Sequence, residues 1–445
     1  MREKLSRLLQ VPFVRNVAKF QVGNLVLQGT GLLGSILYAR LLGLEQFGVY
    51  ALVSAFAGLV TIVAALGQET TLATFLAEEV GRKNTKEIRT VLRYFLQSSF
   101  SASGLLLLLM PVLPFIALLL RNDPNIAHFA RLILLNTALQ FPAVLAFLIL
   151  QLQNRIGLLS ILENARAILQ LCCSVFFLWF GFGVGGLLTG ILLISALYVP
   201  LCTWIYVHYA PALQFPPLGD LLRNLYSGGT KKYFLQGFWI ALDRNVSRNL
   251  YPNAFSMILN AFASVEAVGV FQLAFRLAEA PSKILMPSIA RMSAVTIPRI
   301  VGGDRKSLKK TCIQLIKGTV ALRMLSVIGA ALIVPFLVPV LYGPEFRAAI
   351  PVFLILLPYH LFSALNVASV PLARVFGKTW LMTTVNTTGI GIAIALSFLL
   401  MPLFSPIVAI AISILYYHMH ALLLPLFLWV HVRKERGFSP VTLSR

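Results

Sequence analysis

Residues 44–52 read LEQFGVYAL and residues 265–273 read VEAVGVFQL, so that four residue types recur at an offset of 221. The matched pairs are Glu45 with Glu266, Gly48 with Gly269, Val49 with Val270, and Leu52 with Leu273. The same offset places Val80-Gly81 on Val301-Gly302, and each of these pairs begins a basic segment. The repeat predicts a chain made of two halves with related folds.

The composition indicates that both halves lie in a membrane. Of the 445 residues, 58% are hydrophobic and only 12% are charged, whereas soluble domains have about 25% charged residues. The run LLLLLMPVLPFIALLL at 105–120 is apolar on every side, which is typical of a helix about 20 residues long that crosses the hydrocarbon core. Because the apolar segments do not alternate with polar residues, a β-barrel is excluded.

We expect an all-α polytopic membrane protein with 12 transmembrane helices. The predicted spans lie near 20–42, 48–77, 91–120, 127–152, 157–180, 186–209, 235–260, 266–297, 311–342, 348–375, 379–403 and 405–431. The seventh is the least apolar of them.

The distribution of positive charge predicts the orientation of these helices. The net charge is +22, and about 26 of the 37 Lys and Arg residues lie in one alternating set of loops and termini. The opposite set holds Arg121, Arg131 and Arg347. Since Lys and Arg collect on the cytoplasmic side, both termini are expected there, and this topology explains the basic charge better than nucleic acid binding does.

The repeat and the spans together predict the domain organisation. An N-lobe at 1–209 and a C-lobe at 235–432 each hold six helices, a cytoplasmic linker at 210–234 joins them, and a tail follows at 433–445. An even number of helices per half gives both halves the same orientation. Parallel repeats of this kind are typical of transporters.

The stretch VFQLAFRLAEAPSKILM at 270–286 carries Arg276, Glu279 and Lys283 inside a predicted span. A charge near the centre of such a helix costs about 2.5–3.5 kcal/mol on insertion scales. The three charges share one stripe of the helix, where Glu279 can pair with either cation. The aligned positions in the first half are Ala55, Gly58 and Ile62. The fold therefore does not require the charges, and a functional role is favoured.

Charges inside the other spans extend this pattern toward an excess of cations. We predict substrate-binding roles for Arg244, Arg248, Arg276, Lys283 and Arg40. Candidates for ion coupling or charge pairing are Glu69, Asp243, Glu279 and Glu163. The excess of cations indicates an anionic ligand, and Arg suits phosphate because its planar fork binds two oxygens. Isolated charges such as Arg323 and Arg166 are as well explained by ion pairs or by bonds to backbone carbonyls.

Four segments carry a resemblance to a known family: YARLLGLEQFGVYAL (38–52), EEVGRKNTKEI (78–88), VEAVGVFQLAFRLAE (265–279) and LARVFGK (372–378). With them the chain resembles the polysaccharide or O-antigen flippases of the multidrug/oligosaccharidyl-lipid/polysaccharide (MOP) exporter superfamily. The resemblance implies a two-lobed fold like that of multidrug and toxin extrusion (MATE) transporters, working by alternating access. It also implies a cationic cavity, to which Arg276 and Arg244 correspond best.

The resemblance further implies the substrate and the partners. A polyprenyl-diphosphate-linked oligosaccharide would pass from the cytoplasmic to the outer leaflet of the cell inner membrane, for cell-surface polysaccharide biosynthesis. The expected partners are this anionic lipid-linked oligosaccharide, the lipid bilayer, and glycan polymerase or export enzymes, with no nucleic acid; a monomer is expected. No cofactor, metal or catalytic residue is expected, and coupling to H⁺ or Na⁺ or to the membrane potential would supply the drive.

Two other functions stay open on the sequence. A multidrug or cation antiporter of the same fold would need membrane-embedded acids, and the first span has none. A membrane glycosyltransferase or polymerase would need a sizeable loop with an acidic pair, whereas Asp123 and Asp220 stand alone in short loops.

Overall fold

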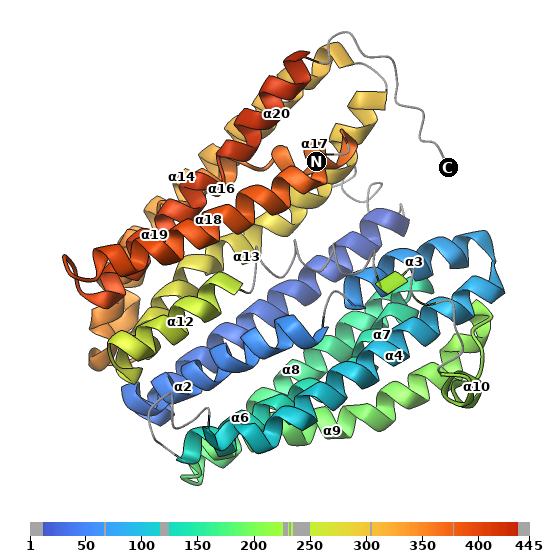
Figure 1. Ribbon diagram of the computed structural model, residues 1–445, viewed down its shortest axis with the longest axis horizontal. Helices are drawn as coiled ribbons and strands as arrows, with labels where there is room; N and C mark the ends of the chain where they lie inside the picture. Colours follow the sequence, from blue (N-terminus) through green and yellow to red (C-terminus); the bar gives the residue numbers. More distant parts are fainter. Residues whose placement is uncertain are drawn as a thin grey trace. The chain divides into compact units, whose positions relative to one another are not determined.

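The fold is described from a computed structural model in which α-helices dominate (Figure 1). The described residues are 12–65, 68–115, 124–225, 230, 233–234, 250–302, 305–376 and 378–434, and they contain no β-strand. Nine helical stretches within these ranges are long and apolar enough to cross a membrane. The first, Gln21–Ile62, has 42 residues, or about 63 Å at 1.5 Å per residue, which is enough for two crossings. These findings confirm the predicted all-α polytopic class.

The nine stretches account for ten of the predicted spans. The seventh span, 235–260, lies largely outside the described residues, and the eighth forms part of a longer, charged helix. Both belong to the second half of the repeat.

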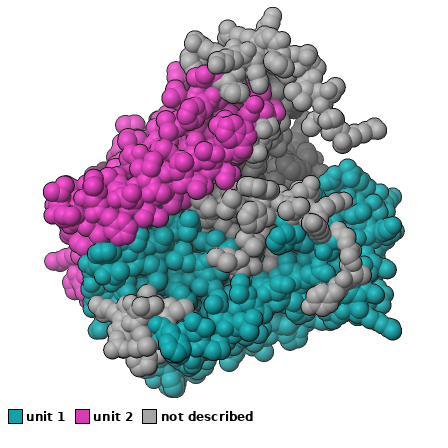
Figure 2. Space-filling model, in the orientation of Figure 1, with its two compact units in different colours: residues 1–269 teal, residues 270–445 magenta. Residues whose placement is uncertain are grey.

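The chain divides into two compact units, residues 1–269 and 270–445 (Figure 2). The division falls within α13 (Val265–Gly302), because α12 (Tyr251–Phe262) packs on the long first helix of unit 1. The lobe boundaries proposed from the sequence, 1–209 and 235–432, stay a prediction.

Unit 1 is a bundle of long antiparallel helices. Its elements are α2 (Pro12–Ala65), α3 (Gln68–Arg82), α4 (Thr85–Leu109), η1 (Met110–Val112), α6 (Pro124–Ala138), α7 (Phe141–Leu152), α8 (Ile156–Trp179), α9 (Gly183–Tyr209), η2 (Ala210–Leu213), α10 (Leu218–Arg223) and α12. Helices α8 and α9 form a hairpin, α2 packs on α8, and α6 and α7 pack on α9 (Figure 1). The turn of the α8–α9 hairpin holds Gly181 and Gly183 at φ +81° and +54°, where a side chain would be strained.

The first two predicted spans are separated at Gly43, whose φ of 70° and ψ of 175° are not helical but are readily adopted by glycine, so α2 consists of two helices on either side of a kink. Other predicted boundaries in unit 1 were wrong. The basic segment 78–93 is mostly helical, because Asn84 accepts a hydrogen bond from the Glu87 amide (3.3 Å) and begins α4 at once. The predicted span 127–152 is divided before Pro142, which lies in the first turn of α7.

Unit 2 consists of most of α13 followed by α14 (Arg305–Leu341), η4 (Pro344–Ala348), α15 (Ala349–Leu356), α16 (Tyr359–Leu365), α17 (Ser369–Val375), α18 (Thr379–Leu400), α19 (Pro406–His420) and α20 (Leu423–Lys434). Helix α13 has 38 residues, or about 57 Å, well beyond the roughly 30 Å of a hydrocarbon core. Helix α18 packs on α19, and α16 packs on both α14 and α19.

The predicted tenth span, 348–375, is not one helix but the three short helices α15, α16 and α17. Pro358 lies between the first two and has no N–H to continue the helical ladder. Irregular backbone at membrane depth is tolerated only where the protein buries it or where it lines a wet cavity. The backbone at this break must therefore be satisfied by other groups of the protein or by water.

The two glycines matched by the repeat pack against each other within unit 1. A Cβ added at Gly269 would lie 3.1 Å from the Cα of Gly48, and one added at Gly48 would lie 2.1 Å from the carbonyl oxygen of Val265. Further along α2, a Cβ at Gly58 would lie 2.2 Å from the side chain of Asn253 on α12. Small residues thus let α2 approach the start of the second repeat closely, as at other helix contacts in membranes.

We expect Gly48→Ala to destabilise the protein, because the added methyl group meets backbone that cannot move aside. Overpacking of this kind costs about 1–3 kcal/mol, so the midpoint of thermal unfolding in detergent should fall by several degrees. Gly31→Ala, in the part of α2 before the Gly43 kink and with nothing within 4 Å of the added Cβ, is the control and should not lower it. Equal midpoints for the two variants would contradict the close contact.

Candidate functional site

The charged stripe of unit 2 lies on α13 and consists of Arg276, Glu279 and Lys283. Arg276 and Glu279 are half-buried, and Lys283 is exposed. The Lys283 Nζ lies 2.9 Å from Glu279 Oε2, so the pairing one turn apart that the spacing predicts is formed with Lys283. The stripe carries two cations against one acid, and it therefore suits an anionic group.

A buried arginine on α14 binds the broken helix beside it. Arg323 lies near the middle of the apolar stretch Lys310–Leu341 and is 7% exposed. Its Nη1 donates to the carbonyl oxygen of His360 at 2.8 Å and to the hydroxyl of Ser363. The sequence left open whether Arg323 forms an ion pair or bonds a backbone carbonyl. The structure shows that it bonds a backbone carbonyl.

His360, on α16, connects this arginine to α13. The imidazole is 1% exposed. Its Nδ1 lies 2.8 Å from the hydroxyl of Ser282, and its Nε2 contacts the carbonyl oxygen of Ala278. Hydrogen bonds from Arg323 and His360 therefore join three helices, α14, α16 and α13, and we call Arg323, His360 and Ser282 the polar bridge.

An aromatic stack flanks the polar bridge. The ring of Tyr359 stacks on His360 with centroids 4.1 Å apart, and on His418 of α19 at 4.5 Å. The stack connects the bridge to a fourth helix. Within the stack, the Tyr359 ring lies against the ring of His360.

Unit 1 has its own buried polar cluster, built around Ser195 of α9. The Ser195 hydroxyl donates to Asn136 Oδ1 of α6 at 2.6 Å, and it accepts from Gln170 (3.1 Å) and Arg166 (3.4 Å) of α8. The Arg166 guanidinium also lies 5.9 Å from the ring centre of Tyr198. Arg166 thus joins helices of unit 1 through a hydroxyl and an aromatic ring.

The other residues predicted for the site are only partly described. Arg40 is exposed on α2, three positions before the Gly43 kink, and Glu163 is half-buried on α8. Glu69 belongs to α3, but its side chain lies outside the described residues. Asp243, Arg244 and Arg248 also lie outside them. The substrate-binding and coupling roles of all these residues remain predictions.

Sequence reasoning missed His360 and Ser282. Both residue types are common and neither is charged, so hydropathy and charge do not single them out. A signal was present in the order Pro358, Tyr359, His360 near the middle of an apolar span. A proline followed by a histidine at that depth indicates a broken helix with a polar group to satisfy.

The segment 210–234, predicted as a linker, packs on the helices of unit 1 where it is described. Phe215 and Leu221 are buried in a core cluster with residues of α3 and α4. The Tyr206 hydroxyl donates to the carbonyl of Pro216 at 2.6 Å, and the Gln97 amide donates to the carbonyl of Leu225. The connection between the halves is thus held on unit 1 by side-chain contacts.

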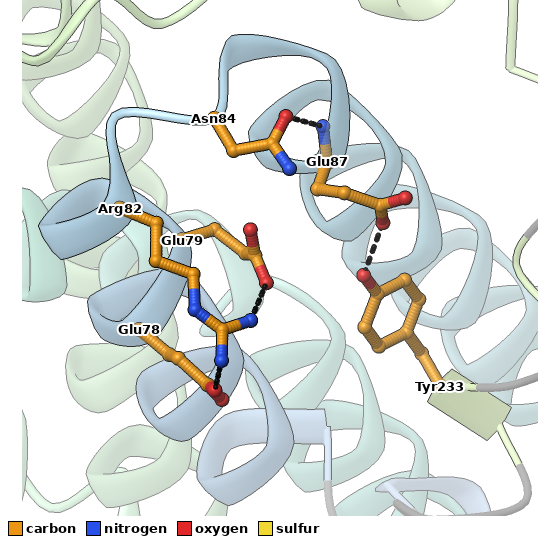
Figure 3. Close-up of polar contacts among 6 residues, drawn as sticks. All are labelled: Glu78, Glu79, Arg82, Asn84, Glu87 and Tyr233. Atoms are coloured by element: carbon orange, nitrogen blue, oxygen red, sulfur yellow. Dashed lines mark hydrogen bonds and ion pairs between the residues drawn. The ribbon is translucent and has the colours of Figure 1, made fainter. Parts of the chain in front are cut away.

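Tyr233 anchors the end of this segment, as Figure 3 shows. It is 1% exposed, its hydroxyl lies 2.5 Å from Glu87 Oε2, and its ring packs edge-on against Phe75 at 5.1 Å. Burial, together with the hydrogen bond to Glu87, raises the pKa of the Tyr233 hydroxyl above its ordinary value. The tyrosine therefore stays protonated and acts as a donor.

The turn beside Tyr233 is held by ion pairs (Figure 3). Arg82, at the end of α3, contacts Glu78 at 2.7 Å and Glu79 at 3.3 Å. Pairs this close to water contribute little each. They keep the basic α3–α4 turn compact next to the Tyr233 anchor.

The comparisons with known proteins agree on one group. A family model described as polysaccharide biosynthesis protein matches residues 37–351. An inward-facing multidrug resistance MATE family transporter of the MOP superfamily is 15% identical, with a TM-score of 0.71 over 94% of this chain and 100% of the other. A MATE transporter in complex with MaD5 is 15% identical, with a TM-score of 0.67 over 96% and 97%.

A further solved structure is a MOP superfamily transporter from Pyrococcus furiosus, 15% identical, with a TM-score of 0.65 over 96% of both chains. Its binding pocket is described as having reverse polarity, which suggests a different function for that protein. No curated protein matches the sequence. At these identities the solved structures show the fold alone.

We expect Tyr233→Phe to lower the free energy of unfolding by about 1.5–3 kcal/mol, because it leaves the Glu87 carboxylate without this donor. Tyr233→Ala should cost more, since a buried ring is also lost. Thermal unfolding in detergent measures both. The adjacent Phe234, 49% exposed, supplies the control Phe234→Ala, which should change the midpoint little. A Tyr233→Phe midpoint equal to wild type would show that the hydroxyl does not hold the segment.

Proposed function

The chain belongs to the polysaccharide biosynthesis protein family, and we propose that it is a flippase for a polyprenyl-diphosphate-linked oligosaccharide. It is a multi-pass transporter of the MOP superfamily, with the fold of the MATE transporters. In the proposed reaction the lipid-linked glycan moves from the cytoplasmic to the outer leaflet of the cell inner membrane. The saccharide would then serve the synthesis of cell-surface polysaccharide.

The observation that carries this proposal is the stripe on α13, a helix predicted from the sequence to cross the membrane, which carries two cations and one acid. Glu279 lies 2.9 Å from Lys283, and by sequence the three side chains carry two positive charges and one negative charge. A charge at this depth is costly unless it faces protein or a wet cavity. An anionic diphosphate would offset that cost, and the planar guanidinium of Arg276 suits its oxygens.

The proposed substrate has a hydrophilic part and an apolar part, and the chain likewise has polar groups within apolar helices. A diphosphate and its sugars are hydrophilic and need a polar path, whereas the polyprenyl tail is soluble in hydrocarbon. The charged stripe on α13 supplies polar groups of the kind that such a headgroup needs.

The fold by itself does not choose the substrate. Similar structures include multidrug transporters and a P. furiosus transporter whose pocket of reverse polarity suggests a different function. Side chains on a shared scaffold therefore decide what is carried. Here the family and the positive stripe both favour an anionic, saccharide-bearing lipid over a cationic drug.

The membrane potential is a sufficient drive in principle. Moving negative charge outward across a membrane that is negative inside releases about 2.3 kcal/mol per charge per 100 mV. With cytoplasmic termini, as the loop charges predict, a substrate made by cytoplasmic enzymes enters from the basic side. Polymerases or export enzymes on the far side would consume the product, and coupling to H⁺ or Na⁺ through Glu69, Glu163, Asp243 or Glu279 is the alternative drive.

We expect Arg276→Ala to reduce transport of a fluorescent polyprenyl-diphosphate oligosaccharide in proteoliposomes by about tenfold to a hundredfold, the equivalent of one charge-assisted contact. The readout is the fraction of glycan that becomes accessible to an enzyme outside the vesicles. Arg347→Ala removes an exposed arginine in η4 and should transport at the wild-type rate.

Glu279→Gln distinguishes the flippase from a cation antiporter. Removing the acid leaves Lys283 unbalanced, so transport of the anionic lipid should be retained or strengthened. A cationic dye, tested in parallel, would depend on that acid. Dye transport that is abolished by Glu279→Gln, with no lipid movement in the wild type, would overturn the proposed function.

A further inference from the structure

The polar bridge contacts α13 on a different face from the charged stripe. His360 reaches Ala278 and Ser282, which are one turn apart on the same side of the helix. At about 100° per residue, this side lies about 120° around the axis from the stripe that holds Arg276, Glu279 and Lys283. The bridge therefore holds α13 from one side while the stripe is presented on another.

The hydrogen bonds of His360 have only one consistent assignment when the imidazole is neutral. A carbonyl oxygen can only accept, so Nε2, which faces Ala278, carries the hydrogen. Nδ1 is then an acceptor, and the hydroxyl of Ser282 donates to it. Both contacts are directional, and each would lengthen if α13 turned about its axis.

The other end of the bridge is fixed by Arg323. Its guanidinium bonds the carbonyl of His360 itself, next to the break at Pro358 where the backbone is irregular. Ser363, one turn further along α16, contacts the same nitrogen and also donates to the His360 carbonyl at 3.2 Å. His360 is thus held by its main chain and reaches α13 with its side chain.

Arg323 and His360 are poorly placed to bind substrate themselves. They are 7% and 1% exposed, and their polar atoms already bond to protein groups of α13 and α16. The ring of His360 is covered by Tyr359. These contacts are better explained if the two residues hold α13 in place than if they touch a ligand.

From this arrangement we propose that Arg323 and His360 are positioning residues that set the rotation of α13 about its own axis, and so direct the charged stripe toward the substrate headgroup. The inference rests on the proposed function, because the stripe is taken as the surface that binds the anionic lipid. Apolar contacts such as those of Leu273 and Ala274, both fully buried on α13, are not directional. Two hydrogen bonds one turn apart supply the direction that those contacts lack.

Ser282→Ala tests the bridge with the smallest change. It removes the donor to Nδ1 and leaves both positioning residues and the stripe intact. We expect the apparent KM for the fluorescent lipid-linked oligosaccharide to rise about twofold to tenfold, the equivalent of one neutral hydrogen bond, with kcat little changed. Ser326→Ala is the matched control, because its hydroxyl bonds within α14, to the Leu322 carbonyl.

Variants of the positioning residues give a rescue series. His360→Gln keeps an amide that can donate and accept, whereas His360→Leu keeps only bulk. Arg323→Lys keeps the charge but loses the planar fork. We expect KM to rise most for His360→Leu and less for His360→Gln, with Arg323→Lys between wild type and His360→Leu.

Cysteine labelling measures the rotation without relying on transport. In a background whose four cysteines are replaced by serine, Ala280→Cys lies on the stripe and Leu277→Cys about 100° from Arg276. We expect Ser282→Ala to change the ratio of their labelling rates with a charged thiol reagent severalfold, and Ser326→Ala to leave it unchanged.

The outcomes separate the two proposals. If the wild type does not move the lipid, the proposed function fails, and the labelling ratio still tests the rotation. If the wild type transports and Ser282→Ala shows an unchanged KM and labelling ratio, the positioning role is overturned. A lower unfolding midpoint with unchanged KM and ratio would also overturn it, because the bridge would then be structural only.

Discussion

A peptide group in hydrocarbon has no water to bond, and this constraint governs the structure. Continuous helices satisfy it along most of the described chain. Close to the break at Pro358, Arg323 donates to the carbonyl of His360 and so ties α16 to α14. A residue that looks like a costly buried charge is thus part of how an irregular segment is tolerated inside the membrane.

The cations in the apolar parts of the chain have two kinds of surroundings. Arg323 and Arg166 are bonded to a carbonyl, hydroxyls or an aromatic ring of neighbouring helices, and they join those helices. Arg276 and Lys283 share a stripe with one acid on α13 and leave that stripe positive. The bonds of Arg323 to other helices support a supporting role for the polar bridge. The bridge and the stripe are also connected, because the bridge contacts the helix that bears the stripe.

Close approach of backbones is the second determinant of the fold. Gly48 and Gly269 are matched by the repeat and are also in contact, at the place where the second repeat meets α2. The segment 210–225 and Tyr233 then pack on unit 1, so the path between the repeats is fixed by Glu87, Gln97 and the core around Leu221.

The sequence alone determined the all-helical membrane class, the repeat, most of the spans and the charged stripe, because hydropathy, charge and helical spacing act locally. Hydrocarbon rejects each charge for reasons that do not depend on its neighbours, so Arg276 and Lys283 stand out without a structure. The tertiary structure decided what the sequence left open for Arg323, divided the tenth span and brought His360 to Ser282. Those outcomes depend on which helices lie side by side. Hydrogen bonds of a few ångströms between residues 78 positions apart cannot be predicted from the local pattern of either helix.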